Sequence, residues 1–258
     1  MGTLDVRLVP ALSDNYVYLL RDTETGTVGI VDPAEVEPVE AALERLGWRP
    51  TVILNTHHHA DHTAGNALLK ERHRLTVIGP AADRARIPEL DQAYGEGDTF
   101  RFGARPVRVF DVPGHTRGHV AFWFEDADAL FCGDTLFALG CGRLFEGTPA
   151  QMWESLLKLR ALPDATRVYC GHEYTLSNAR FALAADPGNA ALRVRAAEVE
   201  ALRARHEPTI PTLLGIERAT NPFLRADDPA LAAALGMEGA GPVEVFAETR
   251  RRKDGFRG

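Results

Sequence analysis

The chain has 258 residues and a formal net charge of −7, and its residues are 45% hydrophobic and 25% charged. These values are ordinary for a soluble globular protein of one large or two modest domains, and the acidic balance argues against nonspecific nucleic-acid binding. No apolar run approaches the length of a membrane span, and no basic segment followed by an apolar one opens the chain. We therefore expect a cytoplasmic monomer with no membrane or nucleic-acid partner.

The first half of the chain consists mainly of strand patterns separated by turns. Residues 36–46 instead repeat apolar side chains at spacings of three and four before Gly47, which predicts a helix. Residues 80–98 are polar with scattered helical character. Strands are predicted at 3–10, 15–21, 28–33, 51–55, 76–79, 99–102 and 106–112, with a second helix at 66–71.

The pattern changes at about residue 175. Before it, we predict strands at 120–124, 129–132 and 167–170, a loop at 135–150 and a helix at 151–162. After it, strand signals stop and helices are predicted at 177–185, 189–206, 229–235 and 243–252. The expected fold is α/β: a sandwich of two mixed sheets with helices outside, over residues 1–174, followed by a helical domain over residues 175–258.

Side chains that bind metals follow the ends of four predicted strands. The densest set lies in Thr56–His62, directly after the strand at 51–55, and the other three strands each end in a glycine followed by histidine or aspartate. Strand ends meet at one edge of an α/β fold, and imidazole and carboxylate suit borderline first-row cations. Seven candidates exceed the needs of one tetrahedral ion and suit two. The candidates are His57, His59, Asp61, His62, His115, Asp134 and His172.

At these residues the chain resembles the metallo-β-lactamase superfamily, whose signature is Thr-His-x-His-x-Asp-His with a later Gly-His, Gly-Asp and final Gly-His. The helical C-terminal region and the segment Gly171–Thr175 are similar to those of the hydroxyacylglutathione hydrolases, also called glyoxalase II. The resemblance covers nearly the whole chain and implies an αββα sandwich with two metal ions, which are zinc, iron or manganese in the family. It implies the following ligands: His57, His59 and His115 for one ion, Asp61, His62 and His172 for the other, and Asp134 as the bridge.

The resemblance also implies a reaction, the hydrolysis of S-(2-hydroxyacyl)glutathione, chiefly S-D-lactoylglutathione, to glutathione and D-lactate. A hydroxide held between two metals would attack the thioester carbonyl, with Asp61 and Asp134 orienting it. A thiol has a pKa near 8.5, so the thiolate leaves without a strong general acid. An amide would need a proton donor, and the sequence offers no obvious one.

Five further residues are implied as glutathione-binding. The family uses a lysine and a tyrosine after the bridging aspartate, a tyrosine after the last histidine, and an arginine and a lysine near the C-terminus. The matching positions here hold Arg143, Phe145, Tyr174, Arg250 and Lys253. Arg143 keeps the charge of the family's lysine with a different hydrogen-bond geometry, and Phe145 lacks the tyrosine hydroxyl.

Alternatives remain for single residues and for the function. His58 and His119 are expected to pack beside the ligands without binding metal, and the three cysteines to be buried thiols. The nearest alternative function is a persulfide dioxygenase of the same superfamily, with one iron held by two histidines and an aspartate and with glutathione persulfide as substrate. His172 and the helical C-terminal region favour the hydrolase. The acidic charge disfavours a nuclease of the superfamily, and the full ligand set disfavours a noncatalytic binding module.

Overall fold

The computed structural model describes residues 2–258, which divide into two compact units. The first unit contains the chain up to Asp111 together with Arg117–Gly133. The second contains Val112–Thr116 and Asp134–Gly258. The predicted domain boundary at 174/175 therefore lies inside the second unit.

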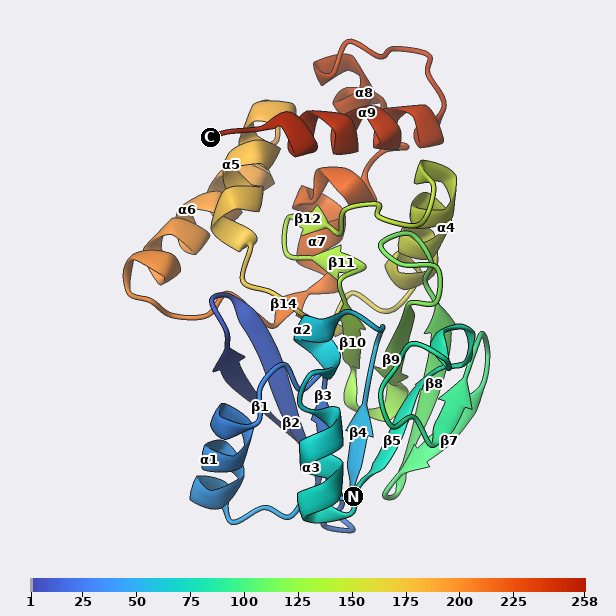
Figure 1. Ribbon diagram of the computed structural model, residues 1–258. Coiled ribbons are helices and arrows are strands. Elements are labelled where there is room, and N and C mark those ends of the chain that lie inside the picture. The colour runs from blue at the N-terminus through green and yellow to red at the C-terminus, as the bar shows by residue number, and fades with distance from the viewer. Residues whose placement is uncertain (1) are drawn as a thin grey trace. The chain divides into compact units, whose positions relative to one another are not determined.

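The first unit begins with a six-stranded mixed sheet in the order β1-β2-β3-β4-β5-β6 (Figure 1). The first three strands pair antiparallel, and β3 to β6 pair parallel. Parallel neighbours need crossover connections, which helices provide between β3 and β4 and between β4 and β5. The elements are β1 (Leu4–Ala11), β2 (Asn15–Asp22), β3 (Val28–Val31), α1 (Glu37–Leu46), β4 (Val52–Leu54), α2 (Ala60–Thr63), α3 (Asn66–His73), β5 (Thr76–Pro80), η1 (Ala81–Asp83) and β6 (Gln92–Tyr94).

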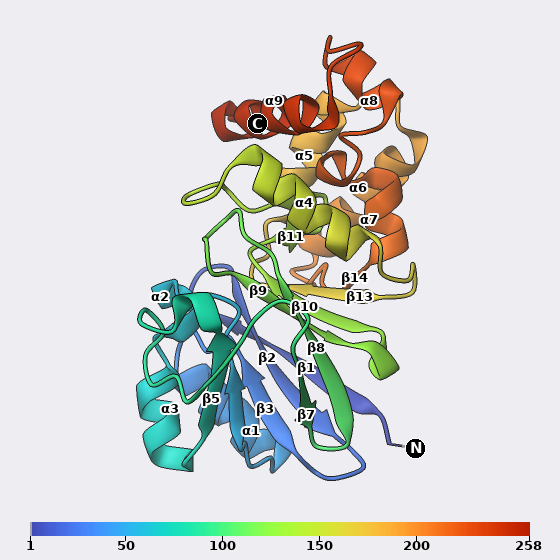
Figure 2. The same cartoon turned by 90° about the vertical axis from the view of Figure 1, so that its right-hand side faces the viewer.

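Four antiparallel strands of this unit belong to the second sheet: β7 (Thr99–Phe102), β8 (Arg105–Asp111), β9 (Val120–Phe124) and β10 (Ala129–Gly133), with η2 (Glu125–Ala127) between the last two. The two sheets stack face to face (Figure 2). The ring of Tyr18 on β2 lies 5.6 Å from that of Phe131 on β10. The backbone of Gly29 on β3 passes so close to Phe102 that a Cβ there would lie 2.6 Å from its ring. Aromatic side chains therefore fill the space between the sheets.

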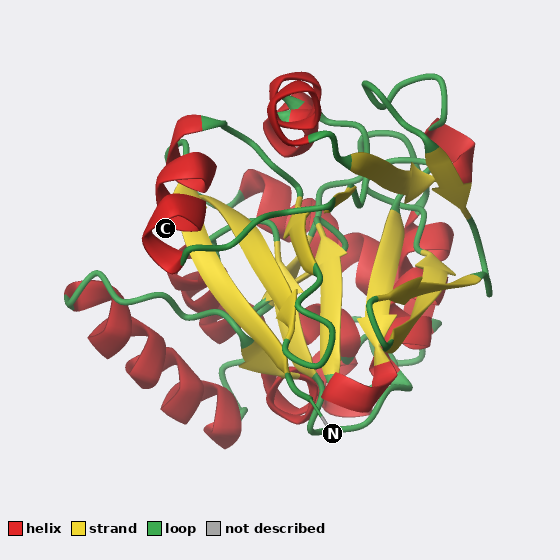
Figure 3. Ribbon diagram, turned by 90° about the horizontal axis from the view of Figure 1, so that it is seen from below, coloured by secondary structure: helices red, strands yellow, loops and turns green. Residues whose placement is uncertain are grey.

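Helices α1 and α3 cover the outer face of the first sheet (Figure 3). Val39 and Leu43 of α1 and Leu69 of α3 pack against Ile30 and Ile53 in one buried cluster. Burying each such side chain contributes about 1.5–3 kcal/mol. This core holds the C-terminal end of β4, from which the histidine-rich segment emerges.

The second unit is mainly helical. Its elements are β11 (Leu136–Phe137), β12 (Gly140–Cys141), α4 (Pro149–Arg160), β13 (Arg167–Cys170), α5 (Thr175–Ala185), α6 (Ala190–Ala204), β14 (Thr212–Leu213), α7 (Leu214–Thr220), η3 (Pro222–Leu224), α8 (Pro229–Ala234) and α9 (Pro242–Gly255). Helices α5 and α6 pack around Leu139. A chain of ring contacts links Trp153 of α4, Phe246 of α9, Phe223 of η3 and Phe181 of α5.

The predicted elements differ from the structure mainly where elements are short. The segment 135–150, expected to be a loop, contains the hairpin β11–β12 and the start of α4. Strand signals were expected to stop at 175, which is wrong, because β14 pairs with β13. Strands of two residues show no alternation, so only their tertiary partners define them. Within residues 2–258, no helix combines the length and apolar character needed to cross a bilayer.

Candidate active site

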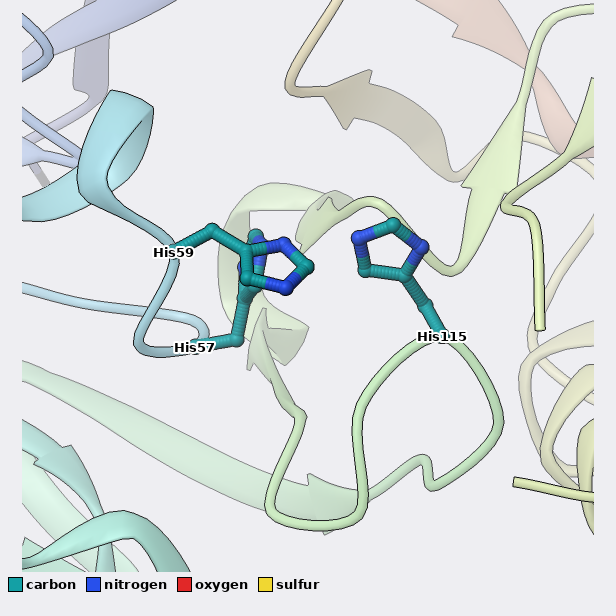
Figure 4. A group of neighbouring side chains, drawn as sticks. All are labelled: His57, His59 and His115. Atoms are coloured by element: carbon teal, nitrogen blue, oxygen red, sulfur yellow. The ribbon is translucent and has the colours of Figure 1, made fainter. Parts of the chain in front are cut away.

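The segment after β4 carries the first group of predicted ligands. His57 and His59 project from this segment, and their atoms Nε2 and Nδ1 lie 3.1 Å apart (Figure 4). His57 is fully buried and His59 is partly exposed. Asn55 donates from Nδ2 to the carbonyl of His62 at 3.0 Å and to Asn66, which ties the start of the segment to its end. His115, also drawn in Figure 4, follows β8 and belongs to the second unit.

Asp32, at the end of β3, organises this segment and was missed by the sequence analysis. Its carboxylate accepts hydrogen bonds from the backbone N–H of Thr56 at 2.8 Å and from the Thr56 hydroxyl at 2.7 Å. Its Oδ2 also lies 3.1 Å from Nδ1 of His62. In the sequence, Val31-Asp32-Pro33 indicates only the end of a strand. The carboxylate at this strand end was the feature that could have identified Asp32 as part of the site. Asp32 is buried with φ of 50°, so the surrounding bonds hold it in the left-handed region.

Asp61 lies at the more exposed side of the same segment. Asn15 donates from Nδ2 to both the carbonyl oxygen and Oδ2 of Asp61, each at 3.1 Å. The Asp61 side chain is 40% exposed, and its Oδ2 lies 3.6 Å from Nε2 of His62. Asn15 therefore orients a carboxylate that remains accessible to a ligand.

His58 and His119, expected to pack beside the ligands, have protein partners of their own. Nδ1 of His58 lies 2.9 Å from Oδ2 of Asp83, which also pairs with Arg86. The ring of His119 stacks on that of His57 at 4.5 Å between centroids, and its Nδ1 lies 3.0 Å from the carbonyl of Val120. These contacts agree with a supporting role for both rings.

The second unit brings together the other group of predicted ligands. Nε2 of His115 lies 3.4 Å from Oδ2 of Asp134, and Nε2 of His172 lies 3.3 Å from the same oxygen. Nδ1 of His115 is 2.9 Å from the carbonyl oxygen of Arg143. All three ligand candidates are buried. Two imidazoles thus converge on a single carboxylate oxygen.

The imidazoles have the arrangement that a metal site requires. Nδ1 of His57, His62 and His115 faces the Thr56 hydroxyl, the Asp32 carboxylate and the Arg143 carbonyl, respectively. An acceptor at Nδ1 fixes the proton there and leaves the lone pair on Nε2 for a cation. Close approaches between ligand atoms, such as the 3.1 Å between His57 and His59, are also the spacing of atoms that share one ion. The donor set therefore fits divalent metal ions.

Aromatic rings flank two of these ligands within the second unit. The ring of Tyr174 stacks on that of His172, with 4.7 Å between centroids and 3° between planes. Phe145 meets His115 edge-on at 5.2 Å. Phe145 is 63% exposed and Tyr174 is 38% exposed. Both rings are therefore available to contact a ligand.

The three predicted cationic contacts differ in exposure. Arg143 is largely exposed, and its Nε lies 3.7 Å from Oδ1 of Asp254. Lys253 donates from Nζ to the carbonyl and hydroxyl oxygens of Ser177, both at 3.0 Å. Burial, together with the neighbouring charges of Arg250 and Arg143, lowers the pKa of Lys253 to about 8. Arg250 is only 5% exposed; it bonds Cys141 O at 2.9 Å and pairs with Asp254.

Residues 12–256 match two family models in succession. Residues 12–172 match the metallo-β-lactamase superfamily, and residues 173–256 match the C-terminus of hydroxyacylglutathione hydrolase. A curated hydroxyacylglutathione hydrolase from Methylococcus capsulatus is 58% identical over 255 residues, which are 99% of this chain and 100% of the relative.

Solved structures agree with the fold. A structure of ETHE1 from Myxococcus xanthus has a TM-score of 0.65 and 25% identity, covering 96% of this chain and 98% of its own. A structure of TTHA1623 in a di-iron-bound form has a TM-score of 0.60 and 28% identity, covering 85% of this chain and 100% of its own. The predicted fold of mixed sheets flanked by helices, with a helical C-terminal region, is confirmed. With its cluster of histidine and aspartate side chains that could hold metal ions, the chain belongs to the hydroxyacylglutathione hydrolase family of the metallo-β-lactamase superfamily.

Proposed function

We propose that this chain hydrolyses S-(2-hydroxyacyl)glutathione, chiefly S-D-lactoylglutathione, to glutathione and D-lactate. The observation that carries the proposal is in the second unit. There Asp134 lies beside the Nε2 atoms of His115 and His172, and the exposed rings of Phe145 and Tyr174 flank these same imidazoles. The candidate metal ligands and the candidate substrate contacts therefore lie side by side. A hydrolase needs this arrangement, because the metal must act on a substrate held next to it.

We assign two divalent metal ions to the chain, zinc, iron or manganese. The proposed ligands are His57, His59 and His115 for the first ion, Asp61, His62 and His172 for the second, and Asp134 for both. When bound, such ions polarise a carbonyl and bring the pKa of water near neutrality. The tautomers fixed by Thr56, Asp32 and the Arg143 carbonyl support this assignment.

The side chains of this protein would then position the thioester and manage its charges. Asp61 and Asp134 orient the attacking oxygen, and each can accept a proton. Arg143 and Lys253 offer cations to the carboxylates of glutathione, while Phe145 and Tyr174 cover its apolar parts. Arg250 is buried, bonds the Cys141 carbonyl and pairs with Asp254, which also lies 3.7 Å from Arg143, so it would support this contact by positioning its neighbours. The leaving thiolate has a low enough proton affinity to depart unaided.

A persulfide dioxygenase is the alternative to be tested, because it shares the superfamily and much of the ligand motif. It would need one iron, whereas His172, 3.3 Å from Asp134 Oδ2, would offer a ligand for a second ion. The similarity to a full-length hydroxyacylglutathione hydrolase also favours the hydrolase.

The experiment measures metal content and two activities on the same purified protein. We expect two metal ions per chain and a loss of the thioester ultraviolet absorbance when S-D-lactoylglutathione is added. Protein stripped with a chelator serves as the control and should regain activity when metal is restored. One iron per chain, with glutathione persulfide driving oxygen uptake and no loss of thioester, would overturn the proposal.

A further inference from the structure

The hairpin β11–β12 of the second unit is buried along its whole length, including its turn. Leu136 and Leu139 have no exposed surface, and Ala138 is 1% exposed. Turns normally lie at the surface, because their backbone groups need water when no protein partner is present. Leu139 also has φ of 57°, a left-handed conformation that a branched side chain rarely adopts. Something in the surrounding structure must hold this turn in place.

Side chains from three helical segments satisfy the hairpin backbone. Asn178 of α5 donates to the carbonyl of Ala138 at 3.1 Å. Asn221, which follows α7, donates from Nδ2 to the carbonyls of Phe137 at 3.1 Å and Gly140 at 3.0 Å. Arg250 of α9 donates to the carbonyl of Cys141 at 2.9 Å. These donors bond the carbonyls of Phe137, Ala138, Gly140 and Cys141.

Glu217 of α7 accepts a hydrogen bond from the backbone N–H of Leu139 in the turn. Its Oε2 lies 2.7 Å from the nitrogen of Leu139 and 3.0 Å from Nδ2 of Asn221, and its Oε1 accepts the Thr212 hydroxyl at 2.8 Å. Glu217 is fully buried. Burial raises the pKa of its carboxyl group, and the bonds from Leu139, Thr212 and Asn221 oppose that rise. Burying a carboxylate is costly, and these three hydrogen bonds offset part of that cost.

The hairpin connects candidate groups at its two ends. Asp134 lies two residues before β11, and Arg143 and Phe145 lie just after β12. Gly142 is packed so tightly that a Cβ there would lie 2.0 Å from the carbonyl oxygen of Asp134. A shift of the hairpin would therefore move the proposed bridging carboxylate and the proposed substrate contacts together.

We propose that Glu217 is a positioning residue for the reaction: it fixes the buried hairpin Leu136–Cys141 through the Leu139 amide and so sets the place of Asp134, Arg143 and Phe145. This inference rests on the proposed thioester hydrolysis for its catalytic consequence. The structural part of the inference is that Glu217 slows hydrogen exchange at residues 136–145, which can be measured without substrate.

The test compares matched variants of the full-length, metal-loaded protein. Glu217→Met keeps the length of the side chain but removes every acceptor, leaving the Leu139 amide unpaired. Glu217→Gln keeps one acceptor for that amide, while its NH₂ can donate to Thr212, so it should behave as the rescue variant. Asp186→Asn is the control, because Asp186 is a buried carboxylate of the same unit that pairs with Arg225.

Two measurements are made on each variant. Hydrogen–deuterium exchange, without substrate, should be faster at residues 136–145 in Glu217→Met than in wild type, and near wild type in Glu217→Gln and Asp186→Asn. The ratio kcat/KM for S-D-lactoylglutathione should fall between about tenfold and a hundredfold in Glu217→Met, because small misplacements cost that much. In Glu217→Gln it should stay within about threefold of wild type.

Other results would overturn the inference. Unchanged exchange at residues 136–145 in Glu217→Met would show that Glu217 does not hold the hairpin. An equal loss of kcat/KM in Glu217→Gln would assign the effect to the lost charge instead of to position. If Glu217→Met does not fold, exchange at the Leu139 amide of the wild-type protein decides the structural part, because an amide that exchanges as fast as those of exposed turns is not held by Glu217. A wild-type protein without thioesterase activity would refute the proposed function, while the exchange data would still decide whether Glu217 holds the hairpin.

Discussion

Lys253 should make substrate binding depend on pH in a range where an ordinary lysine does not titrate. Its Nζ donates to two oxygens of Ser177 and lies 5.6 Å from the ring centroid of Phe181 and 5.8 Å from that of Phe256. Burial among these groups, with the neighbouring charges of Arg250 and Arg143, lowers its pKa from 10.5 to about 8. If the charged ammonium group of Lys253 binds a carboxylate of glutathione, deprotonation of Lys253 weakens substrate binding.

The size of the effect follows from the titration of this one group. With a pKa of about 8, the charged fraction of Lys253 falls from about 90% at pH 7 to about 10% at pH 9. If only the charged form contributes to binding, KM should rise up to about tenfold across this range. Loss of stability does not explain such a rise. A lysine whose folded pKa is depressed favours unfolding most below about pH 8, and this penalty is relieved as pH rises toward about 10.4.

The assay follows the thioester absorbance at several substrate concentrations from pH 7 to pH 9. Lys253→Arg is the matched control, because arginine keeps its charge over this range. The α-amino group of glutathione also titrates here, but it affects the control equally. KM should rise with pH in wild type, rise less in Lys253→Arg, and be high at every pH in Lys253→Ala. A wild-type KM that is flat, or that rises no more than in Lys253→Arg, would refute the reasoning.

Three further substitutions test the proposed ligands and their support. Asp134→Ala should abolish thioester hydrolysis and lower the metal content, whereas normal turnover would exclude a bridging role. Asp32→Asn weakens the acceptor for Thr56 and His62, so metal affinity measured by chelator competition should fall about 10- to 100-fold; unchanged affinity would show that Asp32 only shapes the loop. Gly142→Ala places a Cβ 2.0 Å from the Asp134 carbonyl oxygen, so thermal denaturation should show a loss of about 1–3 kcal/mol, and an unchanged Tm would show that the backbone yields freely.

The long, regular elements could be predicted because their patterns are local. Helix α1 repeats its apolar side chains on one face and ends at Gly47, whose φ of 64° favours glycine. The buried strand β4 and the histidines after it are both evident in the sequence, as are the Gly-Asp and Gly-His strand ends. These patterns indicated the fold class and the candidate ligands. The family followed from the same motif and is confirmed.

Tertiary contacts decided what local patterns could not. The hairpin β11–β12 has two residues per strand, so no periodicity marks it; it exists because Asn178, Glu217, Asn221 and Arg250 bond its backbone. Arg250 illustrates the same limit. The sequence implies by resemblance only that it is a glutathione-binding cation, whereas the folded chain buries it against Cys141.

The sequence by itself determined which ligand types are present and at which strand ends they occur. Only the tertiary structure decided how each is held. Asp32 lies 24 residues before Thr56 and 30 before His62, yet its carboxylate reaches both. Such a contact depends on β3 and β4 being neighbours in a parallel pair. A side chain's chemistry is local, but the hydrogen bonds that fix its tautomer and direction come from distant parts of the chain.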